Sequence, residues 1–348
     1  MRIPLCVWAN HVLARDRPRG LIARSRDGGR YQLRSEVVLA SFGMMLMAAG
    51  PGFAQYPSRE TFTFKKADGV ALEMDVYRAK GEGRHPVVLW IHGGALIFGT
   101  RMDIEYPFAA ALSEAGCTIA SMDYRLAPEA KLPEIMVDVR DAYAWVRAEG
   151  PSRFNADPDR VAVAGASAGG YLTLMAGVLC RPRPRALAVY YGYGDIVGSW
   201  LTEPSEHYRT ILPLVDEIEA NNEIGTTPIV NGSLRDRGKF YLFCRQHGIW
   251  PNRVLGKDPQ KDPEAFGPYL PLKHIDPEWP PMVLIHGELD HDVPADQSRL
   301  AAVALKKAGI KHRLIIVPGA DHGLAGASEQ ELQKVRSEAA AFVLEALR

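Results

Sequence analysis

One short stretch, residues 161–170, constrains the fold of this chain more than any other part of it. It begins with alternating valine and alanine, an apolar run typical of a buried strand. It ends in the pattern Gly-x-Ser-x-Gly centred on Ser167, and the residues that follow, 171–176, favour a helix. A strand, a tight turn and a helix with a serine at the apex form the arrangement known as a nucleophile elbow.

The glycines that flank the serine support this interpretation. A side chain at Gly165 or Gly169 would collide with neighbouring backbone in so tight a turn. The turn would hold the Ser167 hydroxyl above the sheet, at the N-terminus of the next helix, where negative charge is favoured. The alternative is an ordinary strand-to-helix turn, because this pattern alone also arises by chance.

Strand-like and helix-like segments alternate along most of the chain. Residues 60–65 and 70–77 alternate in polarity around an Asp-Gly turn, which predicts an antiparallel hairpin. Buried strands are predicted at residues 86–92, 118–124, 161–166, 186–191, 282–286 and 313–317. Helices are predicted at residues 103–115, 131–149, 295–308 and 328–347. This order predicts an α/β fold whose mostly parallel sheet has helices on both faces and the hairpin at one edge.

A long segment, residues 192–281, lies between the predicted strands at residues 186–191 and 282–286 and contains no obvious buried strand. It is rich in aromatic residues and helical fragments, and it is too long for a plain loop. We expect a helical cap inserted into a domain of residues 56–348 and lying over the strand ends. Trp200, Tyr208 and Trp250 are candidates for lining a substrate pocket, although such aromatics more often form a cap's own core.

The N-terminal residues, 1–55, differ from the rest in composition. Residues 1–34 carry eight arginines against two aspartates, and an uncharged apolar run follows at residues 37–49. Small residues precede Gln55 at the positions that a signal peptidase reads. These features are typical of a secretory signal, so we expect a periplasmic or secreted protein whose mature form lacks this leader or leaves it disordered. The alternatives are an uncleaved membrane anchor and a buried helix of the domain.

Charge and cysteine content exclude several classes of function. Forty-one basic residues balance 41 acidic residues, so no basic field is available to hold a nucleic acid. The cysteines form no Cys-x-x-Cys pair and no cluster with histidine at zinc spacing, so we expect no metal site. Free thiols are expected, with a disulfide as the alternative, for Cys6, Cys117, Cys180 and Cys244.

Three residues that could act together lie just after predicted strands. They are Ser167, Asp290 and His322, and the carboxyl ends of parallel strands are where active sites gather in such sheets. A serine hydroxyl is a poor nucleophile unless a base contacts it, and the base needs an anion to fix its tautomer. His322 is therefore the candidate base and Asp290 the candidate acid.

A fourth strand end carries the sequence His92-Gly93-Gly94. Two glycines let the backbone approach a substrate closely, so the N–H groups of Gly93 and Gly94, with that of Ala168, could bind an oxyanion. Losing one such donor costs about 3 kcal/mol of transition-state stabilisation. His92 itself is expected to hold this loop by hydrogen bonding and not to titrate in catalysis.

Some neighbouring residues compete for these roles. Asp292 is the rival of Asp290, which has the better spacing before the following Val-Pro. We expect His286 to be a packed core histidine and His291 to be an exposed neighbour of the acid. The polar segment of residues 123–129 could be a binding site, but loop-fixing ion pairs and a tyrosine hydrogen bond are favoured.

Taken together, the chain resembles the α/β-hydrolases of the hormone-sensitive-lipase and arylacetamide-deacetylase type and the bacterial esterase/lipase proteins near them. The matching motifs are Ile91-His92-Gly93-Gly94 with Phe98-Gly99, residues 123–129, residues 165–170, residues 287–290 with Val293-Pro294, and Asp321-His322-Gly323. The resemblance implies an α/β-hydrolase fold with Ser167, Asp290 and His322 as the triad. It departs from the family at Ala95, where glycine is usual, and at Ala166, where many members have an acidic residue.

The same resemblance implies a serine carboxylesterase that cleaves small or medium acyl esters through an acyl-enzyme and needs no cofactor. Its expected partner is a small-molecule ester, with neither nucleic acid nor stable membrane insertion unless the leader is retained. An amidase, formamidase or peptidase with the same triad is the first alternative, and a non-catalytic binding protein on this scaffold is the second. The oligomeric state and the preferred acyl length stay open.

Overall fold

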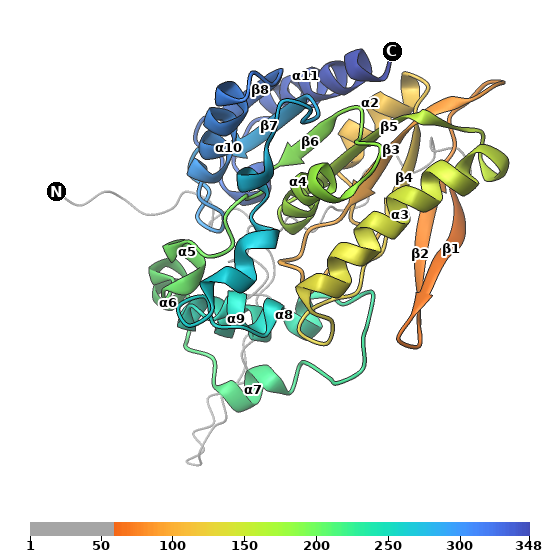
Figure 1. The fold of residues 1–348 in the computed structure, drawn as a ribbon. Coiled ribbons are helices and arrows are strands. Elements are labelled where there is room, and N and C mark those ends of the chain that lie inside the picture. Colours follow the sequence, from red (N-terminus) through yellow and green to blue (C-terminus); the bar gives the residue numbers. More distant parts are fainter. Residues whose placement is uncertain (1–58) are drawn as a thin grey trace, which may run out of the picture. The chain divides into compact units, whose positions relative to one another are not determined.

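The computed structural model describes residues 59–348, and the predicted leader and its signal sequence lie outside these residues (Figure 1). Among the described residues, no helix combines the length and the apolar character needed to cross a membrane. Three of the four cysteines, Cys117, Cys180 and Cys244, are described, and they are buried free thiols, as expected.

A single eight-stranded sheet forms the centre of the described chain, in the order β1-β2-β4-β3-β5-β6-β7-β8. The strands are β1 (Arg59–Ala67), β2 (Val70–Tyr77), β3 (His85–Ile91), β4 (Thr118–Met122), β5 (Ala156–Ala166), β6 (Leu187–Tyr190), β7 (Met282–Gly287) and β8 (His312–Val317). β1, β2 and β4 pair antiparallel, and all other neighbours pair parallel. The predicted mostly parallel sheet with an antiparallel hairpin at one edge is confirmed.

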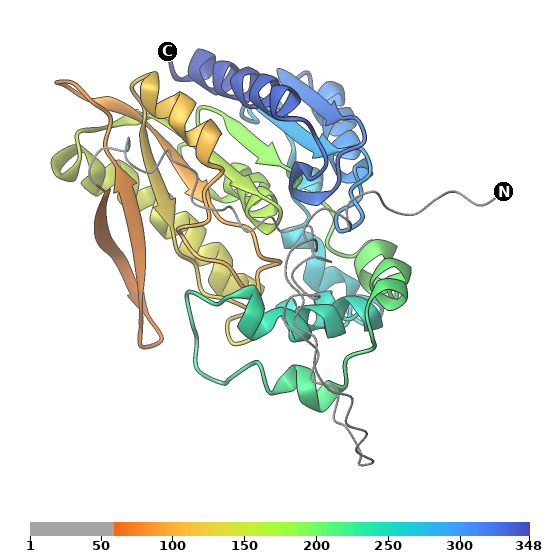
Figure 2. The same cartoon turned by 180° about the vertical axis from the view of Figure 1, so that it is seen from behind.

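Helices cover both faces of the sheet. α2 (Tyr106–Glu114) and α11 (Glu329–Leu347) pack against one face, which Figure 2 shows from the front. α3 (Leu132–Arg153), α4 (Ala168–Leu179) and α10 (Asp296–Lys307) pack against the other. This two-sided cover explains why the central strands are apolar throughout instead of alternating.

β3 shows how its sequence serves both faces. Val87, Leu89 and Ile91 belong to the apolar cluster that includes α3 and α4, whereas Val88 and Trp90 belong to the cluster under α2 and α11. Successive side chains of a strand point to opposite faces, so a continuous apolar run is what a strand buried on both sides requires. All five side chains are at most 1% exposed.

The register of the central strands brings their carboxyl ends to one edge. Ile91 of β3 lies beside Gly165 of β5, and Ala166 of β5 lies beside Tyr190 of β6. Loops that leave these strands therefore start side by side, and the candidate residues of the sequence analysis lie on them. β5 itself begins at Ala156, earlier than the predicted strand, because Ala156 already pairs with His85.

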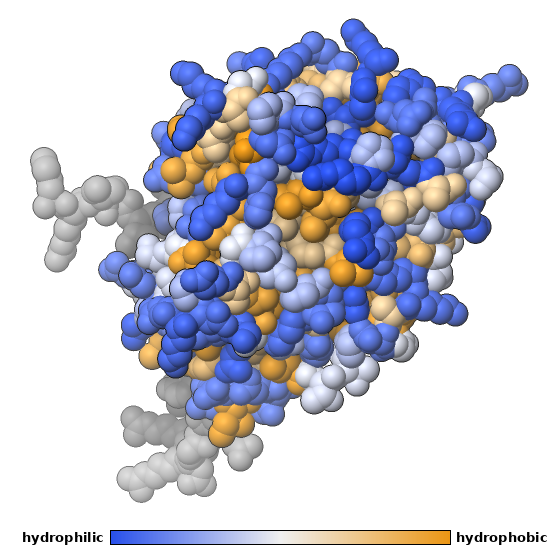
Figure 3. Space-filling view, viewed as in Figure 1, coloured by the Kyte–Doolittle hydropathy of each residue, from blue (hydrophilic) through white to orange (hydrophobic). Residues whose placement is uncertain are grey.

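Residues 192–281, which we call the cap segment, contain helices and no strand of the sheet (Figure 1). The helices are α5 (Ser199–Thr202), α6 (Glu206–Ile211), α7 (Glu217–Asn221), α8 (Leu234–His247), α9 (Trp250–Leu255), η2 (Pro263–Tyr269) and η3 (Pro271–His274). Hydrophobic side chains reach the surface around α7 in the lower part of Figure 3, and Ile218 of this helix is 73% exposed.

α8 is the longest helix of the cap segment, and both of its ends are capped. The Ser233 hydroxyl accepts a hydrogen bond from the Asp236 amide at 3.2 Å, and Gly248 ends the helix in the left-handed conformation that suits glycine. Arg237, Tyr241 and Arg245 recur every four residues and are all buried, so they share the face that the helix turns inward.

Three contacts tie the cap segment to the loop after β3. The Trp250 indole donates to the Ala95 carbonyl at 3.0 Å, and the Arg237 guanidinium donates to the Ile97 carbonyl at 2.6 Å. Gly99 and Gly232 exchange backbone hydrogen bonds of 2.8 and 3.3 Å. Cap and loop are therefore built as one packed unit.

Candidate active site

Ser167 lies at the sharp turn between β5 and α4, as the sequence predicts. Its φ of 54° and ψ of −119° are rare for a side-chain-bearing residue, and they mark a strained backbone. A Cβ added to Gly165 would lie 2.4 Å from the Gly169 carbonyl oxygen, and one added to Gly169 would lie 2.0 Å from that of Ile91. Both glycines are therefore needed for this turn to close against β3.

His322 stands between the serine and an aspartate. Its Nε2 atom is 3.1 Å from the Ser167 Oγ, and its Nδ1 atom is 2.8 Å from Oδ2 of Asp290. The three side chains come from the loops after β5, β7 and β8, which end at the same edge of the sheet. The structure thus brings together all three residues that the sequence analysis selected for a triad, in the order hydroxyl, imidazole, carboxylate.

Asp290 is fixed by its own surroundings. Its Oδ1 accepts hydrogen bonds from the amides of Asp292 and Val293 at 3.0 and 2.7 Å, which leaves Oδ2 for the imidazole. His286 also approaches Oδ2, with its Nε2 atom at 3.2 Å, and is completely buried, as expected for a core histidine. Between the two rival aspartates, Asp290 is the one on the Nδ1 side of His322.

Burial and the nearby carboxylates have opposite effects on the pKa of His322. Burial lowers the pKa of His322, but the carboxylates of Asp290 and Asp292 outweigh that effect and raise it to about 9. Burial likewise opposes the charged form of Asp290, yet His322 and His286 hold the pKa of Asp290 well below its usual range. The site therefore favours an imidazolium next to a carboxylate, the charge state that forms when a histidine removes a proton from serine.

The two glycines after His92 lie beside the serine. A Cβ on Gly93 would lie 3.3 Å from the Ser167 Cβ, and Gly94 has a φ of 99° with the Phe98 carbonyl oxygen 2.0 Å from where its Cβ would be. Among the described residues, the amides of Gly93, Gly94 and Ala168 donate no hydrogen bond to backbone or side chain. Gly93 and Ala168 adjoin Ser167, and Gly94 follows on the same loop, so these amides are suited to binding a negative oxygen.

His92 and Tyr124 hold this loop from below. Their rings stack with centroids 4.2 Å apart, and the Tyr124 hydroxyl is 3.1 Å from the carbonyl oxygens of both His92 and Gly93. His92 Nδ1 is 2.8 Å from the Gly93 carbonyl, and burial lowers the pKa of His92 to about 4. The ring is therefore neutral at pH 7 and donates a hydrogen bond, the positioning role that the sequence analysis expects.

Ala95 has a conformation that explains the family's usual glycine. Its φ is 55°, in the left-handed region, and Leu96 continues there with a φ of 63°. Alanine bears a steric cost in this region that glycine does not. The departure at Ala95 leaves the amides of Gly93 and Gly94 in place and adds a methyl group beside the serine.

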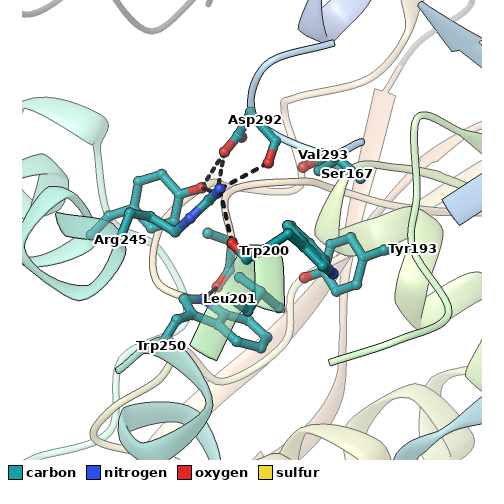
Figure 4. A pocket seen from close by; sticks show the side chains of 10 residues that line it. Ser167, Tyr193, Trp200, Leu201, Arg245, Trp250, Asp292 and Val293 are labelled. Carbon is teal, nitrogen blue, oxygen red and sulfur yellow. Dashed lines mark hydrogen bonds and ion pairs between the residues drawn. The ribbon is translucent and has the colours of Figure 1, made fainter. Parts of the chain in front are cut away.

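A small cavity of about 10 Å³ lies next to Ser167. Its lining comes mostly from the cap segment and consists of Ala95, Ser167, Tyr193, Trp200, Leu201, Tyr241, Arg245, Trp250, Asp292 and Val293 (Figure 4). Trp200 and Trp250 of this set were predicted from the sequence. Tyr208, the third candidate, does not line the cavity, because the side chains of Tyr241 and Arg245 lie next to it on the cavity side.

One charged pair in the wall of the cavity was not predicted from the sequence. Arg245 and Asp292 form an ion pair there, and the guanidinium is 3% exposed (Figure 4). The pattern around Asp290 showed a second aspartate two residues later, which was a signal for one half of this pair. Nothing in the local sequence indicated Arg245, which lies 47 residues earlier, on α8.

The polar segment of residues 123–129, after β4, stabilises loops through ion pairs. This is the role that the sequence favours over a binding site. Asp123 pairs with Arg101 at 2.7 Å, and Arg125 binds Asp138 through two nitrogens at 2.8 Å. Glu129 pairs with Arg237 of α8 at 2.7 Å. These ion pairs include every charged side chain of residues 123–129. Among residues 59–348, no group of histidine, cysteine, aspartate and glutamate could hold a metal ion.

Comparison with known proteins places the chain in a family. Residues 88–326 match the family described as alpha/beta hydrolase fold, and the chain belongs to it. It is 29% identical over 266 residues to the esterase LipC of Mycobacterium tuberculosis, which covers 74% of this chain and 58% of LipC. The chain thus spans little more than half of that relative.

Solved structures share the fold at lower identity. A protein of unknown function from Staphylococcus aureus has a TM-score of 0.68 and 23% identity, over 84% of this chain and all of that one. An alpha/beta hydrolase superfamily protein from Enterococcus faecalis has a TM-score of 0.65 and 20% identity, over 83% and 99% of the two chains. At these identities the likeness concerns the fold.

Proposed function

We propose that this protein is a serine hydrolase that cleaves carboxylic esters through an acyl-enzyme formed on Ser167. The observation that carries the proposal is the line of contacts from the Ser167 hydroxyl through His322 to Asp290, at 3.1 and 2.8 Å. The similarity to an esterase supports it. Its family membership supports hydrolysis in general, whereas the roles of the individual residues rest on the geometry.

In the proposed reaction, Ser167 Oγ attacks the ester carbonyl carbon while His322 Nε2 takes the hydroxyl proton. The carbonyl oxygen becomes an oxyanion that the amides of Gly93, Gly94 and Ala168 bind. As the intermediate collapses, His322 gives its proton to the leaving alcohol, and the acyl group stays on Ser167. A water molecule, deprotonated by His322, then attacks the acyl carbon, and His322 returns the proton to Ser167 Oγ as the acid is released.

The wall next to the serine supports a preference for short acyl groups. A volume of about 10 Å³ is what one water molecule needs, and Trp200, Leu201 and Trp250 are among the side chains that line this cavity. Leu201 and Trp250 are at most 2% exposed, which leaves little freedom to move aside. We therefore expect hydrolysis to fall steeply beyond acetate and propionate.

Two measurements test the proposal. The protein should hydrolyse p-nitrophenyl acetate, and Ser167→Ala should lose this activity while keeping its circular dichroism spectrum and melting temperature. A fluorophosphonate probe should label wild-type protein at Ser167, whereas a non-catalytic binding protein on this scaffold would stay unlabelled. Hydrolysis of p-nitroacetanilide at a comparable rate would favour the amidase alternative instead, and full activity of the alanine variant would end the proposal.

We also propose export from the cytoplasm, on the basis of the arginine-rich segment and the apolar run at residues 37–49, both outside the described residues. N-terminal sequencing of protein recovered from the culture medium or periplasm should begin at Gln55. An intact N-terminus in the membrane fraction would support the uncleaved anchor instead.

A further inference from the structure

The guanidinium of Arg245 is a buried charge brought to the candidate active site by the cap segment. It packs against three rings, with its central carbon 5.4 Å from the centroid of Trp200, 5.2 Å from that of Tyr208 and 5.7 Å from that of Tyr241. Within the described residues, its Nε atom is buried without a hydrogen-bond partner. A buried cation held by rings needs an anion nearby, and here Asp292 supplies it.

Asp292 contacts this cation on one side and His322 on the other, and Figure 4 shows its contact with Arg245. Its Oδ1 accepts hydrogen bonds from Arg245 and from the Tyr241 hydroxyl, and its backbone carbonyl accepts another from Arg245 at 3.0 Å. Its Oδ2 lies 3.5 Å from His322 Nε2, the same nitrogen that is 3.1 Å from the Ser167 hydroxyl. The serine and a second carboxylate thus compete for one nitrogen.

This competition matters because the two partners have opposite effects. A carboxylate facing Nε2 binds the protonated imidazole and would hold the ring away from the serine, whereas catalysis needs Nε2 unprotonated and turned toward Oγ. Two strong donors, Arg245 and Tyr241, occupy Oδ1 and reduce the negative charge that reaches Oδ2. His322 Nε2 is 0.4 Å closer to the Ser167 Oγ than to Asp292 Oδ2, so the serine is its favoured partner.

We propose that Arg245 is a positioning residue, which acts through Asp292 to keep the base His322 directed at Ser167. The role rests on the proposed serine hydrolase function, because it concerns the base of that reaction. The ion pair holds the second carboxylate against the cap segment and neutralises it in part. Without the guanidinium, Asp292 would bind His322 Nε2 and slow the removal of the serine proton.

The other groups around His322 are the same in wild type and in the variants of Arg245. Asp290 faces Nδ1 from the loop after β7, Asp321 precedes the histidine on its own loop, and the ring of Tyr191, after β6, lies edge-on at 4.9 Å. The pair of Arg245 and Asp292 joins the cap segment to the loop after β7. Its two members have opposite charge, so removing one or the other should move the titration of His322 in opposite directions.

The experiment compares the pH dependence of kcat/KM for p-nitrophenyl acetate among variants, since this profile reports the base of the free enzyme. Arg245→Met leaves Asp292 without its counter-ion and should move the midpoint to higher pH by about one pH unit, the low end of the shift that a nearby charge causes. Asp292→Asn should move it to lower pH by a similar amount. The double variant should lie between the two, and Arg245→Lys should stay near wild type.

A matched control comes from the same helix. Arg237 is as buried as Arg245 and also pairs with a carboxylate, Glu129, away from His322. Arg237→Met should lower the melting temperature without moving the pH midpoint. If Arg245→Met does not fold, Tyr241→Phe removes another donor to Asp292 Oδ1, at 2.5 Å, and should also move the midpoint to higher pH.

A second readout needs no turnover. Proton–carbon NMR of protein with labelled histidine should show His322 titrating highest in Arg245→Met, lower in wild type and lowest in Asp292→Asn. This order with an inactive wild type would overturn the proposed function and leave the electrostatic coupling supported. Shifts in the same direction for both single variants, or equal midpoints in all, would overturn the inference even if the wild type is an active esterase.

Discussion

The small cavity beside Ser167 leads to a quantitative prediction for the acyl-chain preference of the variant Trp200→Ala. Trp200 is one of the large side chains that close this cavity and is only partly buried, so its removal makes room at a modest cost to the fold. Each methylene that becomes buried contributes about 0.8 kcal/mol, which is about fourfold in kcat/KM. The two methylenes that distinguish butyrate from acetate then amount to about 1.6 kcal/mol, or about fifteenfold.

The assay is kcat/KM for p-nitrophenyl butyrate divided by kcat/KM for p-nitrophenyl acetate, measured on the same preparation. This ratio should be below one for wild type and should rise by about fifteenfold in Trp200→Ala. A general loss of activity cancels in the ratio, which matters because the Trp200 ring also packs on Arg245. Trp145, a partly buried tryptophan that packs on Phe62 and Phe154, gives the control Trp145→Ala, whose ratio should stay at the wild-type value. An unchanged ratio in a folded Trp200→Ala would show that the acyl chain lies elsewhere.

Four further predictions follow from the site. Asp290→Asn should lower kcat by about 10⁴, because an amide at Oδ2 stabilises the wrong tautomer of His322, and its melting temperature should stay close to wild type. Gly169→Ala places a Cβ 2.0 Å from the Ile91 carbonyl oxygen and should lower the free energy of unfolding by at least about 3 kcal/mol, whereas Gly267→Ala, with no atom within 4 Å, should change it by less than about 1 kcal/mol in urea titrations. Tyr124→Phe removes the hydroxyl contacts to the His92 and Gly93 carbonyls and should lower kcat by about tenfold with little change in KM, and an unaltered kcat would separate Tyr124 from the oxyanion loop. Finally, kcat/KM should rise with pH to a midpoint near 9, because His322 acts as a base only when neutral, and the raised pKa contributes stability that is complete below about pH 6.5 and lost as the pH rises through 9, which urea titrations of wild type and His322→Gln at pH 6 and 10 can compare.

The fold was predictable where the sequence pattern is set by local geometry. The strand-turn-helix around Ser167 follows from an apolar run, two glycines and a helix former, and the structure shows why each glycine is needed. The boundary of β5 was less predictable. Residues 156–159 contain two aspartates and a proline, which favour a turn, yet Ala156 pairs with His85 of the neighbouring strand. Tertiary pairing overrides local preference there.

The candidate site, like the fold, could be predicted from the sequence only in part. Ser167, Asp290 and His322 follow directly after strands, so the parallel sheet alone is enough to bring them to one edge. Tyr208 and Arg245 lie on helices of the cap segment, whose packing is not encoded in any short pattern. Both side chains are buried, and no pattern in the sequence indicates which of them lies near Ser167. Only Arg245 reaches the cavity wall.

The three ties between the cap segment and residues 95–99 have a consequence for protein engineering. Exchanging cap segments between homologues is an obvious way to change specificity, and residues 192–281 look like a convenient cassette. The partners of Trp250, Arg237 and Gly232 nevertheless lie 155, 140 and 133 residues upstream, at Ala95, Ile97 and Gly99. A chimera should therefore inherit both segments from the same parent, because a foreign cap would leave these carbonyls buried without donors and disturb the loop that holds Gly93 and Gly94.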